Sequence, residues 1–527
     1  MKRLLVTLTG IAGFILLFLY IIAEGWMAET WWPAEPIEAE RTVPGADTEI
    51  LFGDLHTHST FSVDAFLMSL EDAGGDGLHS ISDACDFARH CSALDFWSIN
   101  DHGISMNRDR WLNTIDEIRQ CNAVTDPRNP DTVAFLGWEW SQAGVYSNNH
   151  FGHRNVIVKG LAEENIPART IAALPAENTR AAILAERPFP LVGAVALAAG
   201  KSGLKLATFL SEFRGMEQCD SGVPVRELPD DCLEAVATPR ALFAKLRDWN
   251  MDFLVIPHGT TWGMYTPPGS SWDKQLDDGH HDPALQPVIE LYSGHGNSEQ
   301  YRHFTNMVAN AEGAPECPQP HNGFVPGCWR AGEIVYERCI ADAESARECN
   351  SRAAEARRNF WLAPMNMGDK TVPGATPDDW LDAGQCPECW LPAFNYRPRS
   401  SVQYMLALRR FAGDNDSVDR FKFGFIAASD NHSGRPGTGY KEVARSFMTE
   451  SRFDRLPDMV LPRAQPVDKH PASVRIEQPP EPPFRAWNFK RPASWFLTGG
   501  LPAAHHHART RDHLAESPPP PPPPSPP

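Results

Sequence analysis

Residues 50–58 read Ile50-Leu51-Phe52-Gly53-Asp54-Leu55-His56-Thr57-His58, a short apolar run joined directly to two histidines at alternate positions. Side chains two residues apart lie on the same face of a strand, so both imidazoles can reach one point as the chain turns into a loop. Neutral imidazoles are common ligands of zinc, manganese and iron. The stretch therefore predicts a strand that ends in a metal site.

The same pattern recurs along the chain, in short apolar runs that each lead to side chains able to bind a metal. These are Asp101 with His102, Glu139, His258, His295, and Asp430 with His432. Such runs are typical of parallel strands buried on both faces, and helical stretches at 111–120 and 239–249 alternate with them. This alternation predicts a parallel α/β barrel-like fold, in which the carboxyl ends of the strands meet at one site.

A centre with two metal ions needs a bridging carboxylate, several imidazoles and further carboxylate ligands. The chain supplies such a set: His56, His58, Asp64, His102, Glu139, His153, His258, Asp430 and His432. Each of these residues alone is more often an ordinary polar residue, but several strand ends carry them at once. His153 precedes its apolar run, so we expect it to reach the site from a loop or a reversed strand.

Length and net charge limit how many domains the chain can have and which kinds of partner it can bind. A chain of 527 residues has room for roughly two to four domains. Its 48 basic and 67 acidic residues give a net charge of −19, which argues against a nucleic acid bound through a basic surface. An anionic small-molecule substrate fits this charge only where local cations, such as bound metal ions, invert the field.

Residues 1–25 predict an N-terminal transmembrane anchor. Two basic residues precede a nearly uncharged apolar run at Leu4–Ala23, and about 20 apolar residues span a bilayer. No clear cleavage site follows, and a cleaved signal peptide or a buried soluble helix are the alternatives. The flanking charges place the body on the periplasmic or extracellular face, after a linker at 26–47.

The 11 cysteines fall into clusters: Cys85, Cys91 and Cys121; Cys219 and Cys232; and Cys317, Cys328, Cys339, Cys349, Cys386 and Cys389. In an oxidising compartment, closely spaced cysteines are usually disulfides, so we expect the last cluster to be cross-linked. The Cys386–Cys389 pair is also compatible with half of a zinc site. An odd count leaves at least one thiol unpaired or paired between chains.

Two segments depart from the strand–helix alternation. Residues 301–395 carry six cysteines and scattered prolines, which predicts an insertion or lid between barrel segments at 48–300 and 396–455. Residues 456–527 are rich in proline and predict an extended, disordered tail. The His505-His506-His507 tract lies in this tail, and we do not expect it to bind a metal specifically.

Three motifs resemble those of the PHP (polymerase and histidinol phosphatase) superfamily: Asp54-Leu55-His56-Thr57-His58-Ser59 with Asp64, Asn100-Asp101-His102-Gly103, and Ser429-Asp430-Asn431-His432. The stretches around Glu139, His153, His258 and His295 resemble a large bacterial branch known only as a domain of unknown function. The resemblance covers about residues 48–300 and 396–450. It implies a distorted (β/α)7 barrel with a di- or trinuclear metal centre, usually one that hydrolyses phosphoesters.

The resemblance also implies how the metal ions are shared. The first ion would be surrounded by His56, His58, Glu139 and Asp430. Glu139 would bridge to a second ion held by His153 and His258, with His150 as the alternative to His153. A third ion would be held by Asp64, His102 and His432, although many relatives have a histidine in place of Asp64. Phe496–Leu501 resembles the start of a further family segment, from which this chain then departs.

Arg154 and Arg435 are candidates to receive a phosphate through paired hydrogen bonds, with structural salt bridges as the alternative. His295 is expected to contact substrate or to shape its loop, and Glu139, Asp430 and His258 are the expected catalytic residues. The sequence thus predicts an extracytoplasmic phosphoesterase with two or three zinc, manganese or iron ions that activate water. Hydrolysis of an amide or sulfate ester, or a binding protein that keeps the metals, are the alternatives.

Overall fold

The structure is a computed structural model that describes residues 11–20, 49–71, 75, 77–144, 146–173, 193, 197–198, 200–212, 216–260, 266–267, 270–296, 308–312, 315–321, 325–363, 368–375, 377–380, 383, 399, 401–411, 418–438, 469–477, 499–506 and 509–515. The linker at 26–47, the Cys386–Cys389 pair, residues 439–455 and the final polyproline run lie outside these ranges.

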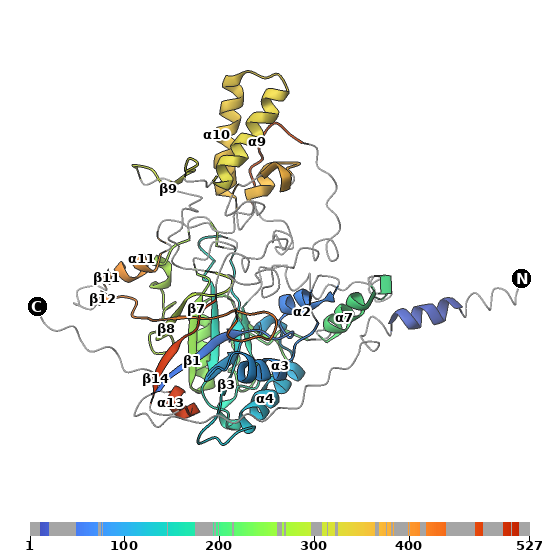
Figure 1. Ribbon diagram of the computed structural model, residues 1–527, viewed down its shortest axis with the longest axis vertical. Helices are drawn as coiled ribbons and strands as arrows, with labels where there is room; N and C mark the ends of the chain where they lie inside the picture. Colours follow the sequence, from blue (N-terminus) through green and yellow to red (C-terminus); the bar gives the residue numbers. More distant parts are fainter. Residues whose placement is uncertain are drawn as a thin grey trace, which may run out of the picture.

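A curled, half-barrel sheet of six strands forms the centre of the molecule, in the order β14-β1-β2-β3-β4-β7 (Figure 1). Its strands are β1 (Glu49–Thr57), β2 (Phe96–Ile99), β3 (Val133–Trp140), β4 (His153–Val158), β7 (Phe253–His258) and β14 (Ala503–His506). The pairs β1–β2 and β2–β3 are parallel. Strand β4 runs antiparallel to both of its neighbours, so His153 does lie on a reversed strand.

A separate parallel pair, β8 (Val288–Tyr292) with β13 (Gly424–Ala427), lies at the open side of the sheet. Backbone hydrogen bonds connect this pair to both edges of the sheet. Val255 N in β7 donates to Leu285 O just before β8, and Gly500 N, just before β14, donates to Ala428 O just after β13. Gly53 N in turn donates to Pro502 O. The carboxyl ends of β8 and β13 are thereby held beside those of β1 and β7.

The C-terminal tail differs from the expectation of disorder over the residues that the structure describes there. Strand β14 pairs antiparallel with β1, from Glu49 opposite His506 to Phe52 opposite Ala503, and α13 (Arg511–Ala515) follows it. Composition indicated an unfolded segment, but the edge of β1 offers unpaired backbone groups that a short strand can satisfy. Tertiary pairing therefore overrides the local sequence signal at this point.

Helices cover one face of the sheet, and their apolar sides account for its burial. They are α3 (Ile81–Asp86), α4 (Arg108–Ala123) and α8 (Pro239–Trp249), which begin at the capping residues Ser80, Asn107 and Thr238. Trp111 of α4 packs edge-to-face on Trp138 of β3, with 5.8 Å between ring centroids. Both rings are buried, and aromatic pairs in this geometry stabilise a core beyond their area alone.

Short elements complete the body. They are α2 (Val63–Ser69), the π-helix η2 (Phe87–Cys91), α7 (Gly200–Ser211), α11 (Val402–Ala407), β5 (Ile171–Ala173), β6 (Glu234–Val236), β11 (Arg410–Phe411), β12 (Val418–Asp419) and the 3₁₀ helices η3 (Gly103–Ser105), η4 (Glu163–Asn165) and η5 (Asp273–Gln275). The pair β5–β6 is parallel and β11–β12 antiparallel. The ring of Phe66 in α2 lies tilted against that of Phe209 in α7, with 4.3 Å between the centroids, so these two helices pack together.

The cysteine-rich segment forms a helical hairpin that projects away from the sheet (Figure 1). Helices α9 (Gly327–Ala341) and α10 (Ala346–Leu362) pack on each other, with β9 (Val308–Ala309), β10 (Pro315–Glu316), η6 (Gly368–Thr371) and η7 (Pro377–Trp380) around them. Disulfides join Cys317 to Cys328 and Cys339 to Cys349. The expectation of a cross-linked segment is confirmed for these four cysteines.

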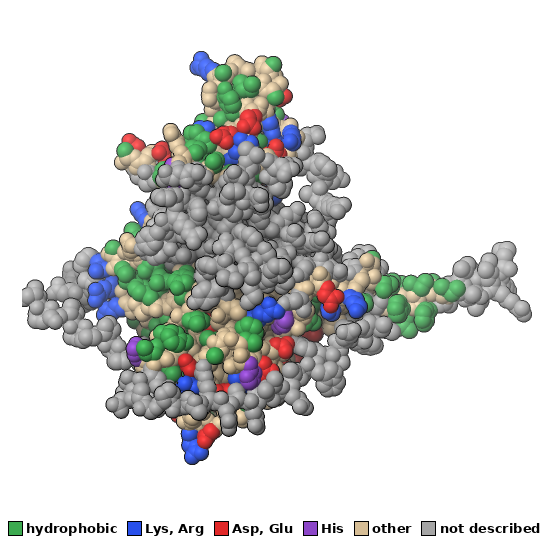
Figure 2. Space-filling model, in the orientation of Figure 1, with side chains coloured by type: hydrophobic (Ala, Val, Ile, Leu, Met, Phe, Trp, Pro, Cys, Tyr) green, Lys and Arg blue, Asp and Glu red, His purple; other side chains and the backbone are tan. Residues whose placement is uncertain are grey.

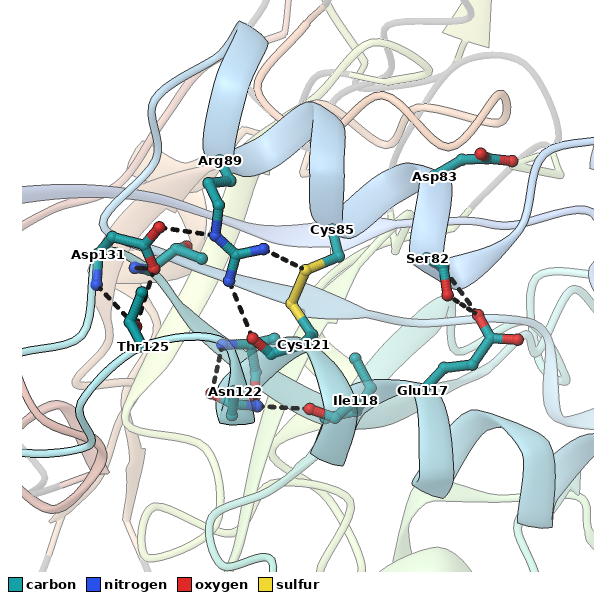
Figure 3. The surroundings of a disulfide bond; sticks show 12 residues. Ser82, Asp83, Cys85, Arg89, Glu117, Ile118, Cys121, Asn122, Thr125 and Asp131 are labelled. Atoms are coloured by element: carbon teal, nitrogen blue, oxygen red, sulfur yellow. Dashed lines mark hydrogen bonds and ion pairs between the residues drawn. A yellow bond between two sulfur atoms is a disulfide. The ribbon is translucent and has the colours of Figure 1, made fainter. Parts of the chain in front are cut away.

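Two further disulfides stabilise the body, Cys219–Cys232 and Cys85–Cys121. The second joins α3 to α4, and Figure 3 shows Arg89 beside it. The Arg89 guanidinium donates to Cys85 Sγ at 3.2 Å, to Cys121 O at 2.9 Å and to Asp131 Oδ2 at 2.6 Å. Cys91 is a free, exposed cysteine. Four disulfides indicate an oxidising, extracytoplasmic location.

The N-terminal apolar run is described only in part. Residues 11–20 are helical, and Figure 2 shows their surface as mainly hydrophobic. The side chains of Phe14 and Leu17 are 70% and 57% exposed. Among the residues that the structure describes, no helix is both long and apolar enough to cross a membrane.

Candidate metal centre

Nine predicted ligands converge at one end of the curled sheet, because eight of them end, begin or closely follow a strand there and Asp64 lies in the helix after β1. His56 and His58 lie at the end of β1, His102 follows β2, Glu139 lies near the end of β3, and His258 ends β7. Asp430 and His432 follow β13, His153 begins the reversed strand β4, and Asp64 lies in the first turn of α2. Backbone bridges join Thr57 to Asn431 and His102 to Glu139.

Glu139 lies at the centre of this group and uses both of its carboxylate oxygens. Oε1 lies 2.5 Å from His153 Nδ1 and 2.9 Å from His258 Nε2. Oε2 lies 2.7 Å from His102 Nδ1 and 3.6 Å from His58 Nε2. The carboxylate is 1% exposed. One buried carboxylate thus faces imidazoles from four segments of the chain, which is the arrangement that a ligand bridging two cations requires.

Asp430 is the second carboxylate that faces several imidazoles. Its Oδ1 lies 3.2 Å from His56 Nε2 and 3.4 Å from His58 Nε2, and its Oδ2 lies 3.2 Å from His295 Nδ1. Asp430 has φ of 52°, in the left-handed region that non-glycine residues seldom adopt. Backbone strain of this kind is tolerated where the surroundings fix it and is frequent at functional sites.

Asp64 and its two neighbours form the third part of the group. Asp64 Oδ2 lies 3.0 Å from His102 Nε2 and 3.2 Å from His432 Nε2. The carboxylate of Asp64 is 29% exposed, so this part of the site is the one nearest to solvent. His150, in contrast, is buried with its Nε2 3.2 Å from Gly259 O. Of the two alternatives, His153 is therefore the histidine that contacts Glu139.

The donor atoms fit metal ions in both type and position. Four sets of three have ligand atoms within 4.8 Å of one another: His58, His102 and His432; His56, His58 and Asp430; His56, Glu139 and His258; and His295, Asp430 and His432. All are nitrogen or carboxylate donors, which suit zinc, manganese or iron. The rings of His58 and His432 stack with 4.1 Å between their centroids, so both side chains lie in the same part of the cluster.

The electrostatics of the cluster keep its carboxylates ionised. Burial opposes ionisation of Glu139 and Asp64, but the histidines around them hold both pKa values well below the usual range. Burial likewise opposes protonation of His56, yet Asp430 and Glu290 raise its pKa to about 10. Burial, with His432 beside it, holds the pKa of His58 well below its ordinary value. Ionised carboxylates thus lie beside histidines that they keep protonated, and a bound cation would take the place of those protons.

Two outer contacts orient the paired histidines of β1, and sequence reasoning did not assign them. Glu290 Oε2 accepts from His56 Nδ1 at 2.9 Å. His58 Nδ1 lies 2.9 Å from Ser62 Oγ, which donates to Asp101 Oδ1 at 2.7 Å. Both contacts favour a proton on Nδ1 and leave Nε2 facing the cluster, as metal-binding histidines require. The available signal was Glu290 itself, a charged residue inside an apolar run.

Two buried carboxylates brace the loops that carry the ligands. Asp54 accepts hydrogen bonds from Ser429 N at 3.1 Å and Gly437 N at 2.7 Å, so it ties the segment around Asp430 to β1. Asp101 accepts from the backbone N–H and the hydroxyl of Ser59 and Ser62, and burial raises its pKa to about 6. Neither belongs to a ligand set, and both hold ligand-bearing segments in register.

No protein-family model, no curated protein and no solved structure matches this chain.

The three expected substrate contacts lie in different settings. Arg154 is 1% exposed, and its guanidinium donates to Phe151 O, Gly152 O and Gln275 Oε1. Burial lowers its pKa to about 9. This placement gives Arg154 a role in holding the turn before β4 and leaves almost none of its surface for a substrate. Arg435 is half-buried and follows His432 by three residues, and His295 lies against Asp430.

Proposed function

We propose that this chain is a metal-dependent hydrolase that cleaves phosphoesters at a centre of two or three divalent transition-metal ions. The observation that carries the proposal is the position of Glu139, whose two oxygens lie 2.5–3.6 Å from imidazole nitrogens on opposite sides. A structural zinc site needs four ligands and is closed. Eight further donors around the carboxylate of Glu139 exceed that need and fit a catalytic cluster better.

We further propose that the curled sheet belongs to a distorted (β/α)7 barrel of the PHP type. The hydrogen bonds from Val255 N to Leu285 O and from Gly500 N to Ala428 O support this, because they connect the β8–β13 pair to both edges of the sheet. In such a barrel, side chains from many strand ends face one site at the carboxyl end. The distribution of the nine donors along the chain agrees with that geometry.

In this proposal His56, His58, Glu139 and Asp430 hold one ion, Glu139 with His153 and His258 a second, and Asp64 with His102 and His432 a third. When bound, the ions would supply Lewis acidity and lower the pKa of water at the site. The chain itself orients the ligands: Glu290 fixes the ring of His56, and Ser62 with Asp101 fixes that of His58. Glu139, Asp430 and His258 are the proposed catalytic residues.

Phosphoesters are the proposed substrates because a centre of two or three divalent ions would let an anion bind even to a chain of net charge −19. Bound divalent ions invert the local field and neutralise charge as it develops on phosphoryl oxygens. Arg435, three residues from His432, is the cationic side chain best placed in sequence to add hydrogen bonds to a phosphate. Arg154 serves the turn before β4 instead.

We also propose that the body acts outside the cytoplasm, tethered by the apolar run Leu4–Ala23. The four disulfides support the oxidising compartment. The length of the run and the two basic residues before it support the tether and its orientation.

Metal analysis of gently purified full-length protein, followed by an activity screen, tests the proposal. We expect at least two transition-metal ions per chain and turnover of phosphomonoesters or phosphodiesters that a chelator abolishes. Turnover of sulfate esters or amides alone would refute phosphoesters as the substrates but would leave the proposed metal centre standing. A metal-loaded protein without turnover on any of these would be a binding protein, and a metal-free active protein would refute the centre.

A further inference from the structure

We infer that His295 is itself a metal ligand and that Asp430 thereby serves two ion positions, one with each oxygen. The inference rests on the proposed metal centre and extends it, because the sequence predicts a substrate contact or a role in its loop for His295 and the resemblance assigns it to no ion. His295 Nδ1 lies 3.2 Å from Asp430 Oδ2. His295, Asp430 and His432 also form one of the four groups in which each residue has a ligand atom within 4.8 Å of those of the others.

The two oxygens of Asp430 face different groups of side chains. Oδ1 lies 3.2 Å from His56 Nε2, 3.4 Å from His58 Nε2 and 3.5 Å from His432 Nδ1. Oδ2 lies on the other side, 3.2 Å from His295 Nδ1, where Ser293 Oγ also donates to it at 3.1 Å. Glu139 divides its oxygens between imidazoles in the same way. The cluster therefore contains two carboxylates with the placement of a bridge.

The loop that carries His295 is fixed at the site by backbone contacts. It follows β8 directly, as the other ligand-bearing segments follow their strands. Gly294 N donates to Ser429 O at 2.9 Å, and Ser293 N donates to Gly296 O at 2.9 Å. His295 N donates to Ser293 Oγ at 3.2 Å. These bonds hold the loop beside Asp430, so the imidazole is positioned before any ion binds.

The ring of His295 is nearly enclosed and lies against another ligand. The residue is 8% exposed, and its ring meets that of His432 edge-on, with 4.4 Å between centroids at 84°. A residue whose role is to contact a substrate usually presents its polar edge to the opening of a site. His295 instead presents Nδ1 to a carboxylate that already faces other histidines. This geometry fits a metal ligand better than a substrate contact.

A competing role is that His295 only donates a hydrogen bond to Asp430 and so positions it. The two roles respond differently to substitution. Asparagine can donate an N–H to Asp430 but is a poor ligand for a transition metal, whereas aspartate offers a ligand oxygen but cannot donate. A ligand role therefore predicts that His295→Asp keeps metal binding and His295→Asn loses it. A positioning role predicts the reverse.

The test uses full-length protein stripped with a chelator and reloaded with Zn²⁺ at a buffered free concentration that just saturates the wild type. Bound zinc per chain is counted by elemental mass spectrometry after gel filtration. We expect His295→Ala and His295→Asn to bind one ion fewer than the wild type and His295→Asp to approach the wild-type count. The matched control, His505→Ala on the exposed strand β14, should equal the wild type.

Circular dichroism of the stripped variants shows whether each has folded, and the comparison of Asp with Asn stays decisive even if Ala is unstable. Wild-type zinc content in both His295→Ala and His295→Asn would overturn the ligand role while leaving the proposed centre intact. Rescue by Asn but not by Asp would overturn it in favour of positioning. A wild type that binds no zinc, manganese or iron would overturn the proposed function together with this inference.

Discussion

The carboxylate of Glu290 lies 2.9 Å from Nδ1 of His56, on the edge of the imidazole opposite to the one that faces Asp430. An ionised carboxylate only accepts hydrogen bonds, so it keeps the proton on Nδ1 and leaves Nε2 for a metal ion. We predict that Glu290→Ala lowers metal affinity by about 10–100-fold, the range for such outer contacts. Competition with a chromophoric chelator measures it.

The metal affinity of Glu290→Gln should lie between those of the wild type and Glu290→Ala, because the amide oxygen can still accept a hydrogen bond from His56. Glu163→Ala is the control, since the side chain of Glu163 is 87% exposed and pairs only with Arg119 among its described contacts. Equal affinity of Glu290→Ala and wild type would mean that the orientation of His56 does not depend on this carboxylate.

Ser62 and Asp101 should act on His58 as one unit. Ser62 Oγ lies 2.9 Å from His58 Nδ1 and donates to Asp101 at 2.7 Å. We predict that Ser62→Ala and Asp101→Asn each lower metal affinity by about 10-fold or more. The double variant should lose less than the sum of the two free-energy changes, because both remove the same chain of hydrogen bonds. Strict additivity in this double-mutant cycle would show that the two residues act separately.

Glu139→Gln tests the central carboxylate. The amide keeps the shape of the side chain but removes the charge that offsets two cations. We expect the occupancy of the paired metal ions and the turnover to fall together, as measured by metal analysis and an aryl phosphate assay. His505→Ala should leave both unchanged, because His505 is exposed on β14 and pairs with Ile50 only through the backbone. Similar losses in both variants would argue against the assignment of ligands.

Thiol counting tests the disulfides. Eight cysteines are paired, Cys91 is free, and Cys386 and Cys389 lie outside the described residues. We therefore expect one to three thiols per chain in denatured, unreduced protein. Under native conditions, Cys91 should be alkylated before any other cysteine that the structure describes. Nine or more thiols would refute the pairing.

Removal of Cys85–Cys121 should cost more stability than removal of Cys339–Cys349. The first closes a sequence separation of 36 residues and the second one of 10, which corresponds to about 4 and about 3 kcal/mol of chain entropy. Paired alanine variants, unfolded with urea, measure the difference in the free energy of unfolding. A larger loss from the Cys339–Cys349 pair would show that native contacts, not loop length, determine these contributions.

Truncation tests the ordered part of the C-terminal tail. A chain that ends at residue 515 should keep wild-type stability, because only the polyproline segment is removed. A chain that ends at 498 also loses β14 and the bonds of Gly500 and Pro502, each worth about 1 kcal/mol, and exposes the edge of β1. We expect a lower urea midpoint and aggregation in gel filtration. Equal behaviour of both chains would mean that β14 contributes little.

The positions of the strand ends were predictable from sequence for a simple physical reason. An apolar run that stops at a polar, ligand-type residue marks the point where a buried strand emerges, and β1, β2, β7 and β13 all end at or just before such residues. The reversed direction of β4 was also signalled, because His153 precedes its apolar run. At these places the local apolar pattern agrees with the burial of the strand, so a single sequence is enough to predict where the strand ends.

Other features depend on contacts between distant segments and leave no local signal. Glu290 accepts a hydrogen bond from His56 because β8 lies near β1. In the sequence alone, Glu290 is only a charged residue that interrupts an apolar run. The guanidinium of Arg154 is surrounded by Phe151 and Gln275, and the local sequence does not indicate either contact. The pairing of β14 contradicts its own composition, because the edge of β1 supplies partners that the tail alone lacks.

The hydrogen bonds from Ser429 N and Gly437 N to Asp54 join residues 375 and 383 positions apart. Contacts of such long range form late, since the entropy of closing the intervening chain must be paid first. During synthesis, β1 therefore leaves the ribosome long before the segment that completes its site. The proposed centre can therefore be complete only when almost the whole body has been made, so under the proposed function the ions available where folding finishes would be the ones that it binds.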